Sequence, residues 1–308
     1  MNLKIKMLIL SCMTCHLVSA QTGDFQPIYP NGKIPNERPD KTAVTEVSEI
    51  GKDGIERISS VSIPAIKYYA PNKRKSKGSA IIICPGGGYG ILAMGHEGDQ
   101  IGKKFAENGI AAFVLKYRLP NEALMQDKSI GPLQDVQQAF KLVREQAETY
   151  GINPQKIGII GFSAGGHLAS SAGVHYQDVK IDNPKKTSLR PDFMLLIYPV
   201  ISMDSGITHG GSRNNLLGKM PNKEMVNYFS NETQVTSDTP PTLLVHAEDD
   251  TAVPIANSKR FYEALQKQQV PSKLITYPHG GHGFGLHNKT TTDKWFDHAL
   301  VWLHEIGF

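Results

Sequence analysis

The stretch IGIIGFSAG, residues 157–165, decides the fold that this sequence predicts. The apolar run 157–160 has the composition of a strand, and the small residues 165–173 that follow the turn have the composition of a helix. Between them, Gly161-Phe162-Ser163-Ala164-Gly165 has the form Gly-x-Ser-x-Gly, in which a serine occupies a tight turn from strand to helix. Small neighbours let the backbone bend there, so the serine hydroxyl projects above the sheet. Ser163 is therefore the candidate nucleophile.

Strand-like and helix-like segments alternate on both sides of this turn. The apolar run 80–84 is typical of a strand buried on both faces of a parallel sheet. Further strands are predicted at 110–115, 193–198, 242–246 and 273–277, and helices near 99–108, 133–150, 256–268 and 295–306. The alternation predicts an α/β fold with a mostly parallel central sheet and helices on both faces. Active sites of such sheets lie at the C-terminal ends of the strands.

Two more side chains complete a candidate catalytic triad. A serine needs a base, and His282 follows the last predicted strand in a glycine-rich loop. The base needs a carboxylate that fixes its tautomer, and Asp250 follows the strand 242–246. The chain order Ser163, Asp250, His282 is that of the α/β-hydrolase fold. Asp249 and His279 remain the alternatives for the carboxylate and the base.

The segment Pro85-Gly86-Gly87-Gly88-Tyr89 follows the strand 80–84, where this fold places its oxyanion loop. We expect the N–H of Ala164 and that of Gly87 or Gly88 to stabilise the oxyanion, with the Tyr89 amide as the alternative. The other interpretation, a phosphate-binding loop, lacks both a Walker lysine and Gly-x-Gly-x-x-Gly spacing.

Other polar residues near these motifs receive weaker assignments. Tyr89, His96 and Glu97 are candidates for binding the substrate, with helix capping and loop packing as the alternative for His96 and Glu97. The long polar segment 202–240 separates two strands and is a candidate cap that selects the substrate. The remaining histidines are interpreted as solvated or structural residues, namely His167, His175, His209, His246, His287, His298 and His304.

The first twenty residues have the pattern of a signal peptide. Lys4 and Lys6 precede the apolar run 7–17, and Val18-Ser19-Ala20 is a small-residue cleavage site. This pattern predicts a secreted or periplasmic protein, with a lipoprotein attached through Cys12 as the alternative. The run is too short to span a bilayer. Cleavage would leave Cys84 as the only thiol, so disulfides would not stabilise the mature fold.

The remaining sequence divides into a short polar segment and one domain. Residues 21–43 are rich in Pro, Gly, Asn and charge and are predicted to form a tether, and 44–308 the α/β-hydrolase domain. The 33 basic and 29 acidic residues are spread along the chain and give a net charge of +4. No arginine-rich patch is present, which argues against a nucleic-acid partner.

Several stretches together resemble one known family, namely residues 85–89, 95–98, 111–120, 161–169, 246–254 and 280–284. The resemblance is to bacterial carbohydrate esterases of the α/β-hydrolase superfamily, which are acetyl-xylan-esterase- or feruloyl-esterase-like proteins. Hormone-sensitive-lipase-type esterases are more distant relatives. The sequence departs from the lipase-type His-Gly-Gly-Gly loop at Pro85, which stands in place of the histidine.

The resemblance implies a Ser-His-Asp esterase that removes acetyl or feruloyl-type groups from plant polysaccharide or its oligosaccharides, without a metal or organic cofactor. Some relatives carry the label xylanase, but glycosidases use paired carboxylates, and the motifs here are nucleophilic. The alternatives are a serine peptidase, a general short-chain carboxylesterase and a non-catalytic binding protein on a hydrolase scaffold. The sequence does not define an oligomeric state.

Overall fold

The apolar run 80–84 forms β5 (Ala80–Cys84), a strand with all five residues buried near the middle of an eight-stranded sheet. The computed structural model describes residues 23–41 and 43–308. Its sheet has the order β1-β4-β7-β5-β8-β9-β10-β11. The strands from β7 to β11 run parallel, and β4 and β1 pair antiparallel at one edge. The other seven strands of this sheet are β1 (Gln26–Pro27), β4 (Ala65–Tyr69), β7 (Ala111–Lys116), β8 (Ile157–Phe162), β9 (Met194–Ile197), β10 (Thr242–Ala247) and β11 (Ser272–Tyr277).

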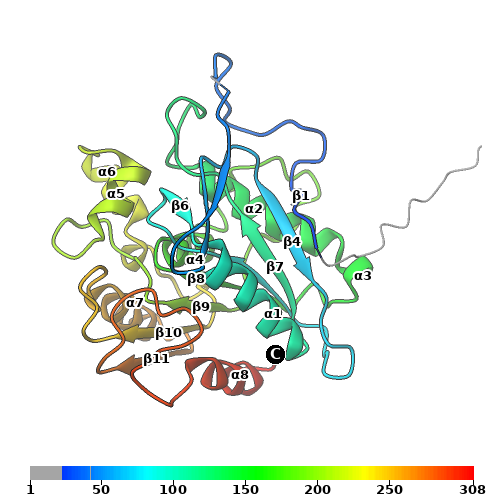
Figure 1. Cartoon of the computed structure of the whole chain (residues 1–308), viewed down its shortest axis with the longest axis vertical. Helices are drawn as coiled ribbons and strands as arrows, with labels where there is room; N and C mark the ends of the chain where they lie inside the picture. Colours follow the sequence, from blue (N-terminus) through cyan, green and yellow to red (C-terminus); the bar gives the residue numbers. More distant parts are fainter. Residues whose placement is uncertain (1–22, 42) are drawn as a thin grey trace, which may run out of the picture.

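Helices cover both faces of this sheet (Figure 1). One face carries α1 (Gln100–Glu107) and α8 (Trp295–Glu305), whose Phe105 and Phe296 rings lie 4.8 Å apart. On the other face, α2 packs on α4, and α7 packs on β10 and β11. Their bounds, with that of the short α3, are α2 (Gly131–Glu145), α3 (Ala147–Tyr150), α4 (Ala164–Val174) and α7 (Ala256–Lys267). This arrangement is that of the predicted α/β-hydrolase fold.

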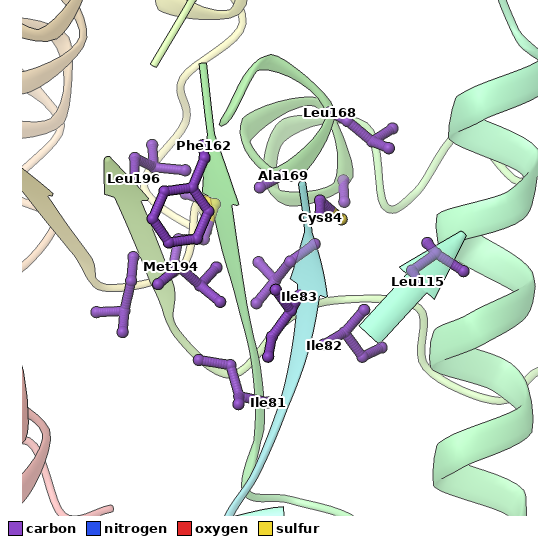
Figure 2. Packing of buried hydrophobic residues seen from close by; sticks show 14 of the residues in the cluster. Ile81, Ile82, Ile83, Cys84, Leu115, Phe162, Leu168, Ala169, Met194 and Leu196 are labelled. Carbon is purple, nitrogen blue, oxygen red and sulfur yellow. The ribbon is translucent and has the colours of Figure 1, made fainter. Parts of the chain in front are cut away.

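The core lies between the sheet and these helices. Ile81, Ile82 and Ile83 are fully buried, as are Phe162 and Leu196 on neighbouring strands (Figure 2). Each buried side chain of this size contributes about 1.5–3 kcal/mol of transfer free energy. The apolar sequence of these strands is thus explained by burial on both faces, and it holds the strand ends that carry the polar residues in fixed positions.

A second, three-stranded sheet lies beside the C-terminal edge of the main one. Its antiparallel strands are β2 (Val47–Ile50), β3 (Glu56–Ser59) and β6 (Ile91–Leu92). A π-helical turn, η1 (Met94–Asp99), follows β6 and leads into α1. The segment 202–240 contains α5 (Gly210–Leu217), α6 (Lys223–Phe229) and the 3₁₀ turn η2 (Asn231–Thr233). Both parts therefore come from connections between strands of the main sheet.

The segment 21–43 is not a free tether where the structure describes it. Gln26–Pro27 forms β1 on the free edge of β4, and Ile28 is fully buried. The Tyr29 hydroxyl lies 3.3 Å from Oδ1 of Asp135, and Arg118 Nη1 donates to the Pro35 carbonyl at 2.9 Å. An edge strand offers unpaired backbone groups, which a segment of turn-like composition can still satisfy. The expected tether is therefore corrected to a packed N-terminal segment.

The predicted signal peptide, residues 1–20, and Cys12 and Cys15 lie outside the described residues. In the described ranges, no helix has both the length and the apolar character that a membrane crossing requires. Cys84 is a free, buried cysteine in β5, and burial raises the pKa of its thiol.

Candidate active site

Ser163 lies on a strained turn between β8 and α4. Its backbone has φ 52° and ψ −120°, which a non-glycine residue rarely adopts. The turn needs glycine on both sides because there is no room for larger residues. A Cβ on Gly161 would lie 2.1 Å from the Gly165 carbonyl oxygen, and a Cβ on Gly165 would lie 2.1 Å from that of Cys84. The small residues of the motif thus allow α4 to start directly against the sheet.

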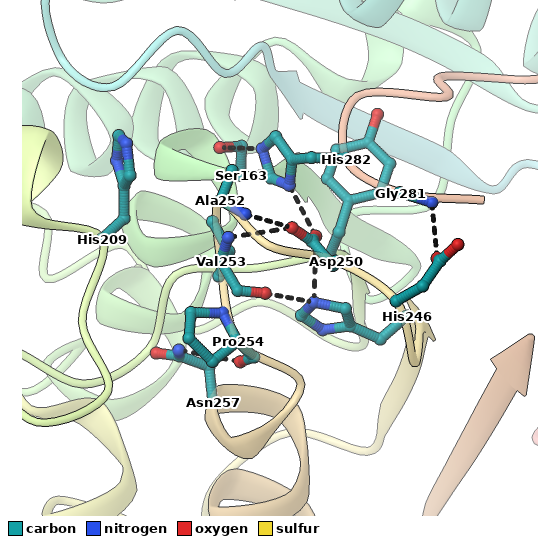
Figure 3. Close-up of polar contacts among 12 residues, drawn as sticks. Ser163, His209, His246, Asp250, Ala252, Val253, Pro254, Asn257, Gly281 and His282 are labelled. Atoms are coloured by element: carbon teal, nitrogen blue, oxygen red, sulfur yellow. Dashed lines mark hydrogen bonds and ion pairs between the residues drawn. The ribbon is translucent and has the colours of Figure 1, made fainter. Parts of the chain in front are cut away.

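Ser163, His282 and Asp250 form one chain of hydrogen bonds (Figure 3). Nε2 of His282 lies 2.8 Å from Ser163 Oγ, and its Nδ1 lies 2.7 Å from Asp250 Oδ2. Ser163 follows β8, Asp250 follows β10 and His282 follows β11, so three separate strand ends supply the group. Asp249 and His279, the alternatives for the carboxylate and the base, face each other at the surface, with Oδ2 and Nδ1 3.3 Å apart.

The carboxylate of Asp250 is held on both oxygens. Oδ1 accepts the N–H groups of Ala252 and Val253, each at 2.9 Å, while Oδ2 faces His282. Burial alone would raise the pKa of this carboxyl group. The hydrogen bonds from His246, His282 and the Val253 amide outweigh burial and hold its pKa well below the usual range. Asp250 is therefore ionised at neutral pH and accepts hydrogen bonds only.

His246 is a second imidazole beside the same carboxylate. It is fully buried, and its Nε2 lies 2.9 Å from the Val253 carbonyl and 3.2 Å from Asp250 Oδ2. Both partners accept only, so Nε2 carries a proton, and Nδ1 lies 2.8 Å from the Ser258 hydroxyl oxygen. The sequence predicts a structural role for His246 but not its contact with Asp250. The available signal was its position four residues before Asp250, at the end of a strand.

The glycine loop after β5 lies against Ser163. A Cβ on Gly86 would be 2.9 Å from the Cβ of Ser163, and Gly87 and Gly88 have φ values of 125° and 63°. The Gly86 amide donates to Oε2 of Glu97 at 2.8 Å. Gly86 is therefore used internally, whereas the amides of Ala164, Gly87 and Gly88, the candidates for the oxyanion hole, have no acceptor among the described residues, and neither has that of Tyr89, the alternative.

Glu97 connects the glycine loop to the histidine loop. Its carboxyl group is buried, and Oε1 accepts the Tyr198 hydroxyl at 2.8 Å while Oε2 accepts the Gly86 amide. The Tyr198 oxygen in turn accepts the N–H of Gly285 at 2.9 Å. The Tyr198 ring also lies edge-on to His282, with centroids 4.9 Å apart. Glu97 thus binds protein groups with both oxygens, which makes it a positioning residue. Tyr198 directly follows β9, and no sequence motif around it predicts this role.

The Tyr89 side chain is removed from the candidate substrate-binding residues. It is 2% exposed, and its hydroxyl lies 2.8 Å from Nδ1 of His167. The backbone at Tyr89 has a φ of 61°, which turns the ring inward against α4. His167 is fully buried, its Nε2 lies 2.8 Å from the Phe229 carbonyl, and burial lowers its pKa to about 4. Its expected structural role agrees with these contacts.

A cavity of about 380 Å³ opens directly onto the triad. Asp53, Ile55 and Arg57, from the β2–β3 hairpin, line part of it. The rest of its lining includes Gly87, Gly88, His96, Glu97, Ser163, His209 and His282. His96, a candidate substrate-binding residue, therefore lines the cavity. His209 also lines the cavity, whereas its sequence predicts a solvated or structural residue. Nothing in the local sequence of His209 indicates that the segment 202–240 folds back over the glycine loop.

A larger cavity, of about 680 Å³, lies between residues 29–35 and α2. None of the triad residues lines it, and we assign the chemistry to the smaller cavity because the strained serine and its hydrogen-bonded partners are there. Across the described ranges, no three His, Cys, Asp or Glu side chains come together as a set of metal ligands.

The model of the BD-FAE family matches residues 66–265, which include Ser163, Asp250, Glu97 and the glycine loop. The chain belongs to the BD-FAE family. This match and the relatives below confirm the expected membership of an α/β-hydrolase carbohydrate esterase family, and they place the chain among carboxylic ester hydrolases. His282 lies beyond the matched residues, in the C-terminal part of the domain.

Known proteins similar to this BD-FAE chain are named as esterases or xylan-active enzymes. The chain is 39% identical over 234 residues to an acetylxylan esterase from Xylanibacter ruminicola, covering 75% of this chain and 45% of that protein. It is 37% identical to endo-1,4-beta-xylanase B of Butyrivibrio fibrisolvens, covering 76% of this chain and 36% of the relative. The chain thus spans less than half the length of these curated relatives.

One solved structure is similar over almost the whole chain. It is an acetyl ester-xyloside bifunctional hydrolase from Caldicellulosiruptor lactoaceticus, with a TM-score of 0.78 and 37% identity. The match covers 93% of this chain and 97% of that one. The two chains therefore share their fold over almost the whole length of each.

Proposed function

We propose that this chain is a serine esterase that removes acetyl groups, or feruloyl-type groups, from plant polysaccharide or its oligosaccharides. The observation that carries the proposal is the hydrogen-bonded chain from Ser163 through His282 to Asp250 at the floor of a cavity. The substrate class is supported by the relatives named acetylxylan esterase and acetyl ester-xyloside hydrolase. The mixed polar lining of the cavity also suits a sugar better than a long acyl chain.

In the first step, Ser163 Oγ attacks the ester carbonyl carbon while Nε2 of His282 takes its proton. Asp250 accepts the Nδ1–H of His282, which fixes the tautomer and stabilises the imidazolium. The amide of Ala164 and that of Gly87 or Gly88 donate to the oxygen that becomes negative. The C–O bond then breaks, and His282 returns the proton to the departing sugar hydroxyl.

In the second step, water replaces the sugar. His282 takes a proton from the water, which attacks the acyl–Ser163 ester, and the same amides stabilise the second tetrahedral anion. Collapse of this anion releases the carboxylic acid and returns the proton to Ser163 Oγ. No bond in this sequence requires an oxidant, a reductant or a further co-reactant.

A serine-directed fluorophosphonate tests the mechanism. It should label Ser163 of the wild-type chain and leave folded Ser163→Ala unlabelled, and Ser163→Ala should lose turnover of 4-nitrophenyl acetate. Mass spectrometry of acetylated xylan and of a feruloylated oligosaccharide after incubation identifies the acyl group that is removed. A folded wild-type chain that is neither labelled nor active would overturn the proposal and favour a binding protein.

The other hydrolytic candidates are separated by substrate. The same triad can cleave both esters and amides, so a serine peptidase is a candidate. A peptidase would cleave amino-acyl amides in preference to acetyl esters. A general short-chain carboxylesterase would cleave 4-nitrophenyl acetate but not acetylated xylan. Parallel assays with these three substrates therefore assign the class.

We also propose that residues 1–20 direct export of the chain. The supporting observation is the order of charge, apolar run and small-residue site in the sequence. Expression of the full chain in a bacterial host should give a periplasmic or secreted product that begins at Gln21. A product modified at Cys12 would support the lipoprotein alternative, and an uncleaved product in the cytoplasm would contradict both.

A further inference from the structure

His209 is positioned beside the glycine loop by the helix that it precedes. The residue lies directly before α5 and lines the cavity that contains Ser163 and His282. Asn215, in α5, donates from Nδ2 to the Gly88 carbonyl at 2.9 Å, so α5 is attached to the glycine loop. The His209 Cε1 atom lies 3.5 Å from the place that a Cβ on Gly88 would take. The imidazole therefore lies against the oxyanion loop, at the wall of the cavity.

The hydrogen bonds of His209 fix which nitrogen carries the proton. Nδ1 accepts the N–H of Ser212 at 3.2 Å and lies 2.8 Å from its hydroxyl oxygen, as the N-cap of α5. The neutral ring therefore carries its proton on Nε2. Burial lowers the pKa of His209, the nearby His282 lowers it further, and Asp250 only partly opposes them. The ring is thus neutral at neutral pH.

The Nε2–H of His209 has no hydrogen-bond acceptor among the described residues. Nε2 makes no hydrogen bond to any residue in the described ranges, and Figure 3 draws His209 apart from the bonded network of Asp250 and His246. The side chain is half-buried. A neutral N–H donor at the wall of a polar cavity suits an uncharged oxygen acceptor, such as a hydroxyl, ring or glycosidic oxygen.

We infer that His209 binds the alcohol part of the ester, donating its Nε2–H to an oxygen of the sugar that carries the acyl group. This inference rests on the proposed esterase function and assigns a specificity role to the segment 202–240. The ion pair of Arg57 with Asp53, 2.6 Å between Nη2 and Oδ2, lines the same cavity and adds further polar groups for a carbohydrate.

The test compares a substrate that has a sugar with one that lacks it. His209→Asn keeps a good N-cap for α5, because asparagine caps helices well, but its shorter side chain no longer places a donor at the position of Nε2. We expect the ratio of kcat/KM on an acetylated xylo-oligosaccharide to kcat/KM on 4-nitrophenyl acetate to fall about tenfold, the effect of losing one neutral hydrogen bond. The loss should be mainly in KM for the sugar ester, because the contact exists before the transition state. His304→Asn, on the exposed surface of α8, is the matched control and should keep the wild-type ratio.

Each result decides the assignment. A ratio unchanged in His209→Asn overturns it, and so does an equal loss on both substrates, which would indicate a structural role for the N-cap alone. Thermal unfolding of each variant shows whether α5 still packs. A wild-type chain active on 4-nitrophenyl acetate but inactive on acetylated sugars overturns the sugar contact while the serine mechanism stands. Inactivity on both substrates overturns the proposed function and the contact with it.

Discussion

Nε2 of His246 lies 3.2 Å from Oδ2 of Asp250, so the carboxylate that orients the half-buried His282 also contacts a second, fully buried imidazole. His246→Leu removes this N–H donor and replaces the imidazole with an apolar side chain of similar size. We expect kcat on 4-nitrophenyl acetate to fall about 10- to 100-fold, the range for one hydrogen bond to a charged group. KM should change much less, because the contact orients the base and does not touch substrate.

The conservative variant separates positioning from packing. His246→Gln retains an N–H donor near Asp250 and should recover part of the kcat that His246→Leu loses. Thermal unfolding shows how much stability each variant loses. Equal kcat in wild type and folded His246→Leu would show that the carboxylate needs no second imidazole.

Removal of the Glu97 carboxylate should affect two loops at once. Glu97→Ala leaves the Gly86 amide and the Tyr198 hydroxyl without their partner. We expect the free energy of unfolding to fall by about 2–4 kcal/mol, because each buried polar group left without a partner costs about 1–3 kcal/mol. We also expect kcat to fall about 100-fold, since small displacements of catalytic groups are costly.

Tyr198→Phe is the matched control for Glu97→Ala, because it removes only the hydroxyl that links Glu97 to Gly285. Its loss of kcat should be smaller. Urea denaturation and steady-state kinetics measure both effects. A Glu97→Ala variant with normal kcat would show that the glycine loop keeps its position without the carboxylate.

The turn at Ser163 should not tolerate a methyl group at Gly165. In Gly165→Ala, the added Cβ would lie 2.1 Å from the Cys84 carbonyl oxygen, which belongs to β5 and cannot move away easily. We expect a loss of about 3 kcal/mol in the free energy of unfolding. Gly210→Ala, at the start of α5, has no atom within 4 Å of its added Cβ and should be close to wild type. Urea denaturation of the two variants compares them directly.

Asp250 should contribute to the acid sensitivity of the fold. Its folded pKa lies below the unfolded value of about 3.9, so the unfolded state binds this proton more readily. The stabilisation is present in full above the unfolded pKa and is lost as the pH falls through the folded pKa. In Asp250→Asn, the free energy of unfolding should fall less steeply below about pH 4, by up to ~1.4 kcal/mol per pH unit. Parallel slopes for the two proteins, from urea titrations at several pH values, would contradict this linkage.

The sheet could be predicted from the sequence because its signals are local. The apolar run of β5, the alternation of strands and helices and the glycines around Ser163 each reflect burial or steric limits within a few residues. The position of Asp250 and His282 followed from a topological rule that brings strand ends to one edge. The triad residues therefore meet although about 120 positions separate the ends of the group.

The roles of the other side chains depend on contacts that no local pattern encodes. Neither His209 nor His246 belongs to a recognisable motif, yet His209 lines the cavity and His246 is buried beside Asp250. Tyr89 turns inward because its backbone takes a positive φ in the glycine loop. The N-terminal segment has a turn-like composition, yet it completes the sheet edge through backbone pairing, which composition does not reveal.

The link from Gly86 through Glu97 and Tyr198 to Gly285 also has a consequence for engineering. Gly86 and Glu97 are 11 residues apart, but Tyr198 and Gly285 are distant from both in sequence, and all four meet at one buried junction. A chimera that exchanges only one of these segments with a relative would therefore combine groups that do not match. Recombination libraries built from this scaffold should therefore move the glycine loop, the η1 turn, the end of β9 and the histidine loop as one block.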